Sequence, residues 1–351
     1  MLVYPDDKNL QYSGRIDFDD AKHPKLVYPC SYVKIKFTGS SLKAVVENKR
    51  SCWDNYMGYI VDGRQGKKLL PPSGKITLEL ANGLGGGEHT AMLFKRMDSC
   101  HVVTFHGFMA DGCAKVCALP PKPERKIEVY GDSVSAGEVS EAVDYAGLPD
   151  PENNGEFSNS FYSYAWMTAR KLNAQIHDVA QGGVALLDGT GWFAAPDYIG
   201  MENVYDKIEY FPELGPVKQW DFNLYRPHVV IIAIGQNDNH PEDYMKEDYN
   251  CEKAVKWRAH YKAFVRKIRS IYPKAVIILA TTILEHDRSW DDSIEQVTRE
   301  LNDKKVCHFM YTANGCGTKG HIRIPEADKM SDELAGFIGS FGEDIWHDEK
   351  G

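Results

Sequence analysis

The stretch "KIEVYGDSVSAGE" (residues 126–138) places a serine directly after Gly-Asp, at the point where an apolar run stops. The run "IEVY" predicts a β-strand, and the residues after Ser133 can begin a helix whose first N–H groups favour a negative charge beside the serine. Two interpretations of Ser133 are open on this stretch alone: a nucleophile, or a hydroxyl that caps a turn or a helix. The residues around the stretch narrow the choice.

Downstream of this stretch the sequence alternates between strand and helix. The continuous apolar runs "HVVIIAIG" (228–235) and "KAVIILATT" (274–282) are typical of parallel strands that are buried on both faces. Apolar residues at helical spacing predict helices within residues 160–172 and 251–273. This order predicts a three-layer α/β domain with a parallel sheet.

Upstream, residues 1–120 form a series of short β-type runs, each broken by turn residues. Short strands at regular spacing predict an all-β sandwich, jelly-roll-like in type. The segment "LPPKPERK" (119–126) suits neither a sheet nor a helix, because its prolines lack the backbone N–H. We therefore expect a sandwich domain at 1–120 and a catalytic α/β domain at 121–351.

Composition and charge exclude several classes of partner. The chain has 351 residues and a net charge of −9 with scattered basic residues, so neither nucleic acid nor an anionic membrane is an expected partner. No secretory leader is recognisable, and we expect a cytoplasmic protein unless residues have been removed from the amino terminus. The eight cysteines show no Cys-x-x-Cys pair, so reduced thiols are expected and a zinc site is not.

Three further residues follow predicted strands, where ligands gather in an open α/β sheet. In "VAQGGVALLDG" (179–189) a glycine lets a backbone N–H approach a ligand, and either Gly182 or Gly183 could do so. In "IIAIGQND" the amide of Asn237 could donate to an oxyanion, an interaction worth about 3 kcal/mol. His321 lies before the last predicted helix and could act as a general base. Taken singly, Asn237 could instead bond to its own loop, and His321 could be a surface residue.

In chain order, Gly-Asp-Ser, Gly, Gly-x-Asn-Asp and a late Gly-His resemble the SGNH (GDSL-type) hydrolase superfamily, with Ser133, Gly183, Asn237 and His321 at its four signature positions. The amino-terminal sandwich, the proline-rich join, "KIEVYGDS" and the closing "GH(x)8MSDELAGFI" look like carbohydrate esterase family 2. Members of that family remove acetyl groups from plant polysaccharides. The resemblance covers the whole chain.

The resemblance implies acyl transfer through a covalent intermediate. Ser133 would attack the ester carbonyl while His321 takes its proton. The amides of Ser133 and Gly183 and the side chain of Asn237 would hold the oxyanion. Neither a metal nor an organic cofactor is implied.

Two positions depart from the pattern. Thr318 stands where most members of the superfamily have the aspartate that orients the histidine, and Ile322 stands where the family has proline. We therefore expect a Ser133–His321 dyad whose histidine is oriented by backbone carbonyls, as the resemblance suggests for some family 2 esterases.

The expected substrates are acetylated xylo- or manno-oligosaccharides derived from hemicellulose. Aromatic faces commonly hold sugars, and Trp192 and Trp290 flank the motif loops, so these two are the expected substrate contacts, with core packing as the other interpretation. The alternatives are a lipase- or thioesterase-type esterase on the same scaffold, and an inactive carbohydrate-binding relative. The oligomeric state is left open.

Overall fold

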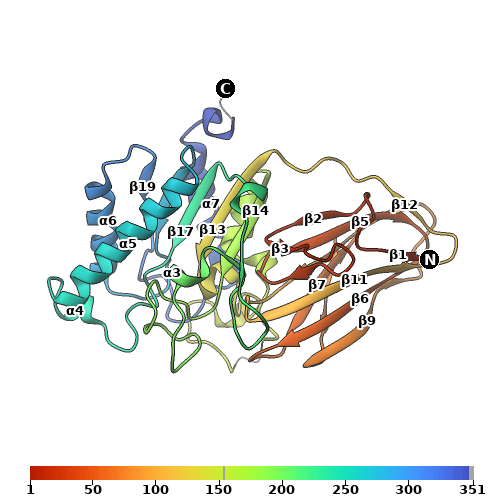
Figure 1. Cartoon of the computed structure of the whole chain (residues 1–351), viewed down its shortest axis with the longest axis horizontal. Coiled ribbons are helices and arrows are strands. Elements are labelled where there is room, and N and C mark those ends of the chain that lie inside the picture. Colours follow the sequence, from red (N-terminus) through yellow and green to blue (C-terminus); the bar gives the residue numbers. More distant parts are fainter. Residues whose placement is uncertain (153–154, 348–351) are drawn as a thin grey trace.

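The structure, a computed structural model, describes residues 1–152 and 155–347, so the predicted domain end at residue 351 lies outside the described residues. Figure 1 shows two parts side by side, an all-β part that contains the amino terminus and an α/β part that contains all the longer helices. None of the helices in the described ranges is long and apolar enough to cross a bilayer, and the expected cytoplasmic location stays a prediction.

The amino-terminal part is a sandwich of two antiparallel sheets, as predicted. One sheet has the order β3-β4-β11-β6-β9, with β1 paired to β11: β1 (Leu2–Val3), β3 (Ile16–Asp17), β4 (Lys25–Leu26), β6 (Ser41–Arg50), β9 (Ser73–Asn82) and β11 (His101–Ala110). The other has the order β12-β5-β10-β7-β8, with β2 paired to β5: β2 (Gln11–Ser13), β5 (Tyr32–Thr38), β7 (Tyr56–Val61), β8 (Arg64–Leu69), β10 (Glu88–Lys95) and β12 (Lys115–Cys117). Apolar side chains of the two inner faces form one core.

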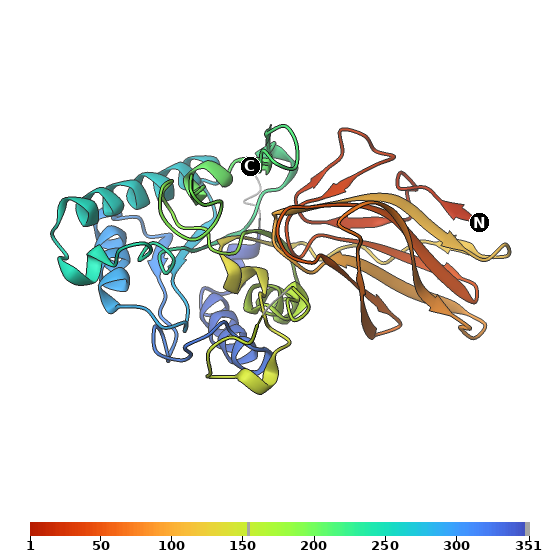
Figure 2. The same cartoon turned by 90° about the horizontal axis from the view of Figure 1, so that it is seen from below.

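The second part is a three-layer α/β domain, as predicted. Its parallel sheet has the order β14-β13-β17-β18-β19: β13 (Arg125–Gly131), β14 (Ala174–Ala180), β17 (Val229–Ala233), β18 (Val276–Ala280) and β19 (Val306–His308). Helices α2 (Tyr164–Lys171) and α7 (Ile324–Gly339) cover one face, and α5 (Glu252–Ile271) and α6 (Arg288–Leu301) cover the other (Figure 2).

Shorter elements join these layers. They are α1 (Ser133–Ala136), α3 (Met201–Val204), α4 (Tyr244–Glu247), the paired strands β15 (Lys207–Glu209) and β16 (Lys218–Gln219), and 3-10 turns at Val143–Tyr145, Ser160–Tyr162, Phe222–Leu224 and Glu343–Trp346.

Continuous apolar strands arise because both faces of the parallel sheet are covered. In β17, Ile231 packs on the side of α2 and α7, whereas Ile232 packs on the side of α5 and α6. Neighbouring residues in β13, Val129 and Tyr130, divide between the two faces in the same way. Each strand therefore needs apolar residues at successive positions.

The two parts share a buried ion pair. Arg15 of the sandwich and Glu128 of β13 are both fully buried, with the guanidinium Nη2 3.0 Å from the carboxylate Oε1. The same guanidinium donates to the carbonyls of Tyr205 and Lys207, at 2.5 and 3.2 Å. The last strand of the sandwich ends at Cys117 and the parallel sheet begins at Arg125, so the boundary expected at residue 120 falls in the joining segment.

Candidate active site

Ser133 is the first residue of α1, immediately beyond the carboxyl end of β13. Asp132 caps this helix, because its Oδ1 accepts a hydrogen bond of 3.0 Å from the N–H of Val134. Its other oxygen, Oδ2, accepts hydrogen bonds from the side-chain amides of Gln236 (2.6 Å) and Asn237 (3.0 Å). Burial raises the pKa of Asp132 to about 6, although these hydrogen bonds favour the carboxylate. Asp132 thus connects the serine turn to the loop after β17.

The two glycines after β14 differ in what their amides contact. The N–H of Gly182 donates to Asp98 Oδ2 at 3.1 Å. The N–H of Gly183 has no hydrogen-bond partner among the described residues. Gly183 has a φ of +74°, and a Cβ there would lie 2.8 Å from the Cβ of Trp192, so this position requires glycine. Of the two amides, that of Gly183 is the one available to a ligand.

The amide of Asn237 is held by two acceptors. Its Nδ2 donates to Asp132 Oδ2 at 3.0 Å and to the carbonyl of Val184 at 3.1 Å. Next to it, the buried Asp238 accepts from the N–H of Leu186 (2.9 Å), which belongs to the loop after β14. These contacts fix the loops after β14 and β17 against each other. An oxyanion would share or displace one of the two acceptors of Asn237.

His321 is oriented by a carboxylate rather than by backbone carbonyls, so the expected dyad arrangement is wrong. Its Nδ1 lies 2.5 Å from Asp150 Oδ2, and its backbone N–H donates to Asp150 Oδ1 at 2.8 Å. The buried guanidinium of Arg323 donates to the same Oδ1 at 2.7 Å. Thr318, at the usual aspartate position, instead donates its hydroxyl to the carbonyl of Gly320 at 3.1 Å.

The second ring nitrogen of His321 faces another acid. Its Nε2 lies 3.8 Å from Glu138 Oε2, and both side chains are mostly buried. Burial lowers the pKa of His321, but the charge of Glu138 and the hydrogen bond and charge of Asp150 outweigh it and raise the pKa to about 9. For Asp150, burial is in turn outweighed by the hydrogen bonds from His321 and Arg323, which hold its pKa below its usual range.

One cavity of about 770 Å³ brings the four residues at the signature positions together. Its wall contains Ser133, Gly183, Asn237 and His321, together with Glu138, Asp150 and three further charged side chains (Glu213, Glu285 and Lys319). Its aromatic lining comprises Trp53, Trp192, Phe193 and Phe211. A serine, a histidine paired with a carboxylate, and free amide donors in one cleft are the groups that acyl transfer requires.

The chain is similar in sequence to known esterases. The family model described as carbohydrate esterase 2 N-terminal matches residues 12–120. The cellulase/esterase CelE of Acetivibrio thermocellus is 30% identical over 95% of this chain. The matched region is 40% of the length of CelE, so the chain spans less than half of that protein. The acetylxylan esterase/glucomannan deacetylase of Cellvibrio japonicus is 28% identical, over 80% of this chain and 74% of that protein.

A solved structure matches both domains at once. It is a family two carbohydrate esterase from Clostridium thermocellum in complex with cellohexaose, 27% identical, with a TM-score of 0.79 over 96% of this chain and 100% of that one. Both domains of the chain are therefore similar to those of family two carbohydrate esterases. The SGNH-type fold with an amino-terminal sandwich agrees with the fold that the sequence predicted.

The two tryptophans expected to contact substrate have different positions. Trp192 lines the cavity, is 60% exposed, and stacks on His240 with ring centroids 3.4 Å apart. Trp290 is fully buried in the first turn of α6, where its Nε1 donates to Asp243 at 3.0 Å. The prediction that Trp290 contacts substrate is therefore wrong, because its ring packs against Trp257 in the core.

Three residues of the cleft were missed in the sequence. Asp150 lies in the loop between α1 and α2, 171 residues before His321, and no motif links the two positions. Trp53 comes from the sandwich, in the turn between β6 and β7. Glu138 lies within residues 126–138, five residues after Ser133. An acidic side chain this near a candidate nucleophile in sequence is a signal from which Glu138 could have been predicted.

Proposed function

We propose that this chain is a serine esterase that removes O-acetyl groups from carbohydrates through an acyl-enzyme intermediate. The observation that carries the proposal is one cavity that contains Ser133, Gly183, Asn237 and a histidine held by Asp150. Within the described residues, the N–H of Gly183 has no hydrogen-bond partner. The sequence similarity to esterases of family 2 supports the same activity.

In the proposed reaction Ser133 Oγ attacks the acetyl carbonyl while His321 Nε2 accepts the hydroxyl proton. Asp150, at Nδ1, keeps the proton of that nitrogen in place and stabilises the imidazolium that forms. The imidazolium then protonates the departing sugar oxygen, and the acetyl group stays on Ser133. Water, deprotonated by His321, releases acetate and restores the serine.

The oxyanion would be held by the amides of Ser133 and Gly183 and by Asn237. Ser133 occupies the first turn of α1, where backbone N–H groups have no partner within the helix. Of the two glycines, Gly183 is preferred because Asp98 already accepts from Gly182. Each donor of this kind is worth about 3 kcal/mol in the transition state.

We further propose acetylated xylo- or manno-oligosaccharides as substrates. The exposed face of Trp192 and the ring of Trp53 offer flat surfaces for sugar rings, and the charged side chains of the wall offer hydrogen-bonding groups for hydroxyls. This mixture of aromatic and charged groups suits a sugar better than a long acyl chain, which needs a continuous apolar groove.

The test is mass spectrometry of acetylated xylan and mannan oligosaccharides before and after treatment with the protein, with Ser133→Ala as the control. Loss of acetyl groups with the wild type alone is the expected result. Faster hydrolysis of octanoyl than of acetyl p-nitrophenyl esters would indicate a lipase-type enzyme. Failure of a folded sample to react with a fluorophosphonate at Ser133 would indicate an inactive binding protein.

A further inference from the structure

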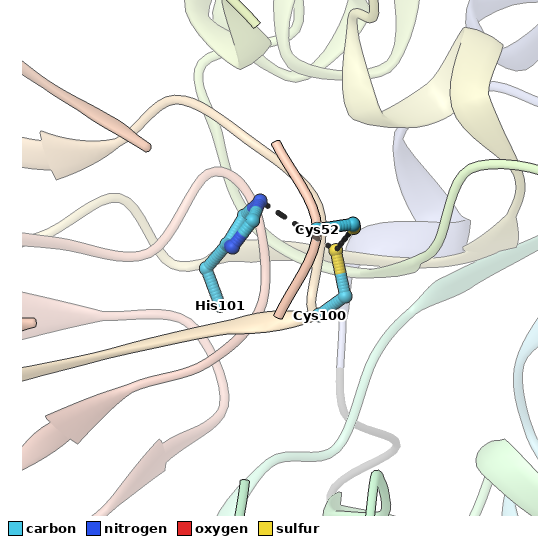
Figure 3. Close-up of side chains that lie close together, drawn as sticks. All are labelled: Cys52, Cys100 and His101. Carbon is cyan, nitrogen blue, oxygen red and sulfur yellow. Dashed lines mark hydrogen bonds between the residues drawn. The ribbon is translucent and has the colours of Figure 1, made fainter. Parts of the chain in front are cut away.

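Two thiols and an imidazole converge beside the cleft but play no part in the proposed reaction. Cys52 Sγ lies 3.2 Å from Cys100 Sγ, and Cys100 Sγ lies 3.6 Å from His101 Nε2. Figure 3 shows the three side chains pointing toward one another. The three atoms that could bind an ion all lie within 4.8 Å of one another.

The pairing of β6 and β11 builds this cluster. His101, the first residue of β11, pairs with Arg50, the last residue of β6. Cys100 therefore precedes one strand at the same sheet end where Cys52 follows the other, 48 residues away in sequence. The donors come from two separate segments, which is why cysteine spacing in the sequence does not reveal them.

We propose that Cys52, Cys100 and His101 form a binding site for a soft divalent cation of the zinc type. Tetrahedral zinc places two sulfur ligands about 3.7 Å apart, and a sulfur and a nitrogen ligand about 3.6 Å apart. The thiols, 3.2 Å apart, would need to separate by about 0.5 Å, whereas the distance from Cys100 Sγ to His101 Nε2 already fits. Cys52 is exposed and can make this movement.

The surroundings of the cluster suit a metal ion. Cys100 and His101 are both fully buried, so packing holds two of the three donors in place. A disulfide between the cysteines would also be compatible with their proximity, but it would need an oxidant and would leave the adjacent imidazole unused.

The site has access to solvent through the substrate cleft. Ser51, Cys52 and Trp53 all belong to the cavity wall, so an ion can reach Cys52 and a water molecule can supply the fourth ligand. Coordination by Cys52 would attach this turn to the start of β11. An ion bound here would therefore hold Trp53 in a fixed place at the wall of the cleft.

Cobalt(II) titration of the full chain, kept reduced with a phosphine, tests this site. Tetrahedral thiolate ligation produces intense visible bands and a thiolate-to-cobalt charge-transfer band, and zinc in competition should remove both. One cobalt per chain is expected for the wild type and for Cys113→Ser, a substitution of an exposed cysteine beyond the opposite end of β11. Cys52→Ser should weaken binding by about tenfold or more, because even outer-shell changes cost that much.

Weak octahedral bands, or equal affinity in Cys52→Ser, would overturn the proposal. It would also be overturned if mass spectrometry of the reduced sample showed Cys52 and Cys100 still joined as a disulfide. Cys52 is exposed, so its substitution does not threaten the fold. The readout is spectroscopic, so it is independent of esterase activity.

Discussion

Replacing Glu138 with glutamine should extend esterase activity to lower pH. A general base works only when neutral, so with a pKa of about 9 activity falls as the pH drops below that value. At pH 7 about 1% of His321 would then be neutral. Removing the negative charge of Glu138 lowers the pKa of His321 and increases this fraction.

The magnitude follows from the 3.8 Å between Glu138 Oε2 and His321 Nε2. Two unit charges at this distance interact by about 1.1 kcal/mol in water and by about 4.4 kcal/mol at an effective dielectric constant of 20. The weaker value corresponds to about 0.8 pH unit. Asp150 and Asp132 also raise the pKa of His321, so only part of the increase disappears when Glu138 loses its charge. We expect the acid limb of Glu138→Gln about one pH unit lower than that of the wild type.

The assay is kcat/KM for p-nitrophenyl acetate as a function of pH, which reports the pKa of the essential base in the free enzyme. Glu285→Gln is the matched control, because Glu285 lines the same cavity but is not among the charges that raise the pKa of His321. An acid limb that stays in place in Glu138→Gln, or moves by the same amount in both variants, would refute the electrostatic argument.

Three further changes probe the site and the core. Asp150→Asn should lower kcat by a factor on the order of 10⁴ with little effect on KM, because removal of the orienting acid has this effect in serine-protease triads. Steady-state kinetics measures both constants. Trp192→Ala should raise KM for acetylated oligosaccharides and leave p-nitrophenyl acetate hydrolysis nearly unchanged; equal effects on both would speak against a sugar contact. Trp290→Ala should lower the free energy of unfolding, measured in urea, by about 3–5 kcal/mol. A variant with unchanged stability and a raised KM would contradict the core position of Trp290.

The fold was predictable because its strongest signals are local. The runs around β17 and β18 are apolar at every position, and two covered faces of a parallel sheet require such runs. Helix α6 is not among the helices predicted from the sequence, because most side chains at its start are charged. Its buried positions, Trp290, Ile294 and Val297, are spaced for a helix but are few.

The site was only partly predictable, since its orienting acid depends on a contact that no sequence spacing encodes. Ser133, Gly183 and Asn237 each follow a strand of the parallel sheet and His321 precedes helix α7, so the topology predicts that they gather at one end of the sheet. Asp150 lies in an irregular loop, and it reaches His321 because Gly320 has no side chain. A Cβ at residue 320 would lie 2.6 Å from Asp150 Oδ1. Two distant loop positions of this kind become related only through the folded chain.

The buried pair of Arg15 and Glu128 limits how this chain can be rearranged by recombination or by protein engineering. Separating the sandwich from the α/β domain would leave Glu128 without its guanidinium partner, and a buried charge that loses its partner costs about 3–5 kcal/mol. It would also uncover apolar residues of the α/β core that pack on Tyr28 and Val102. The sandwich therefore contributes to the core of the α/β domain, and an engineered exchange should move the two domains together.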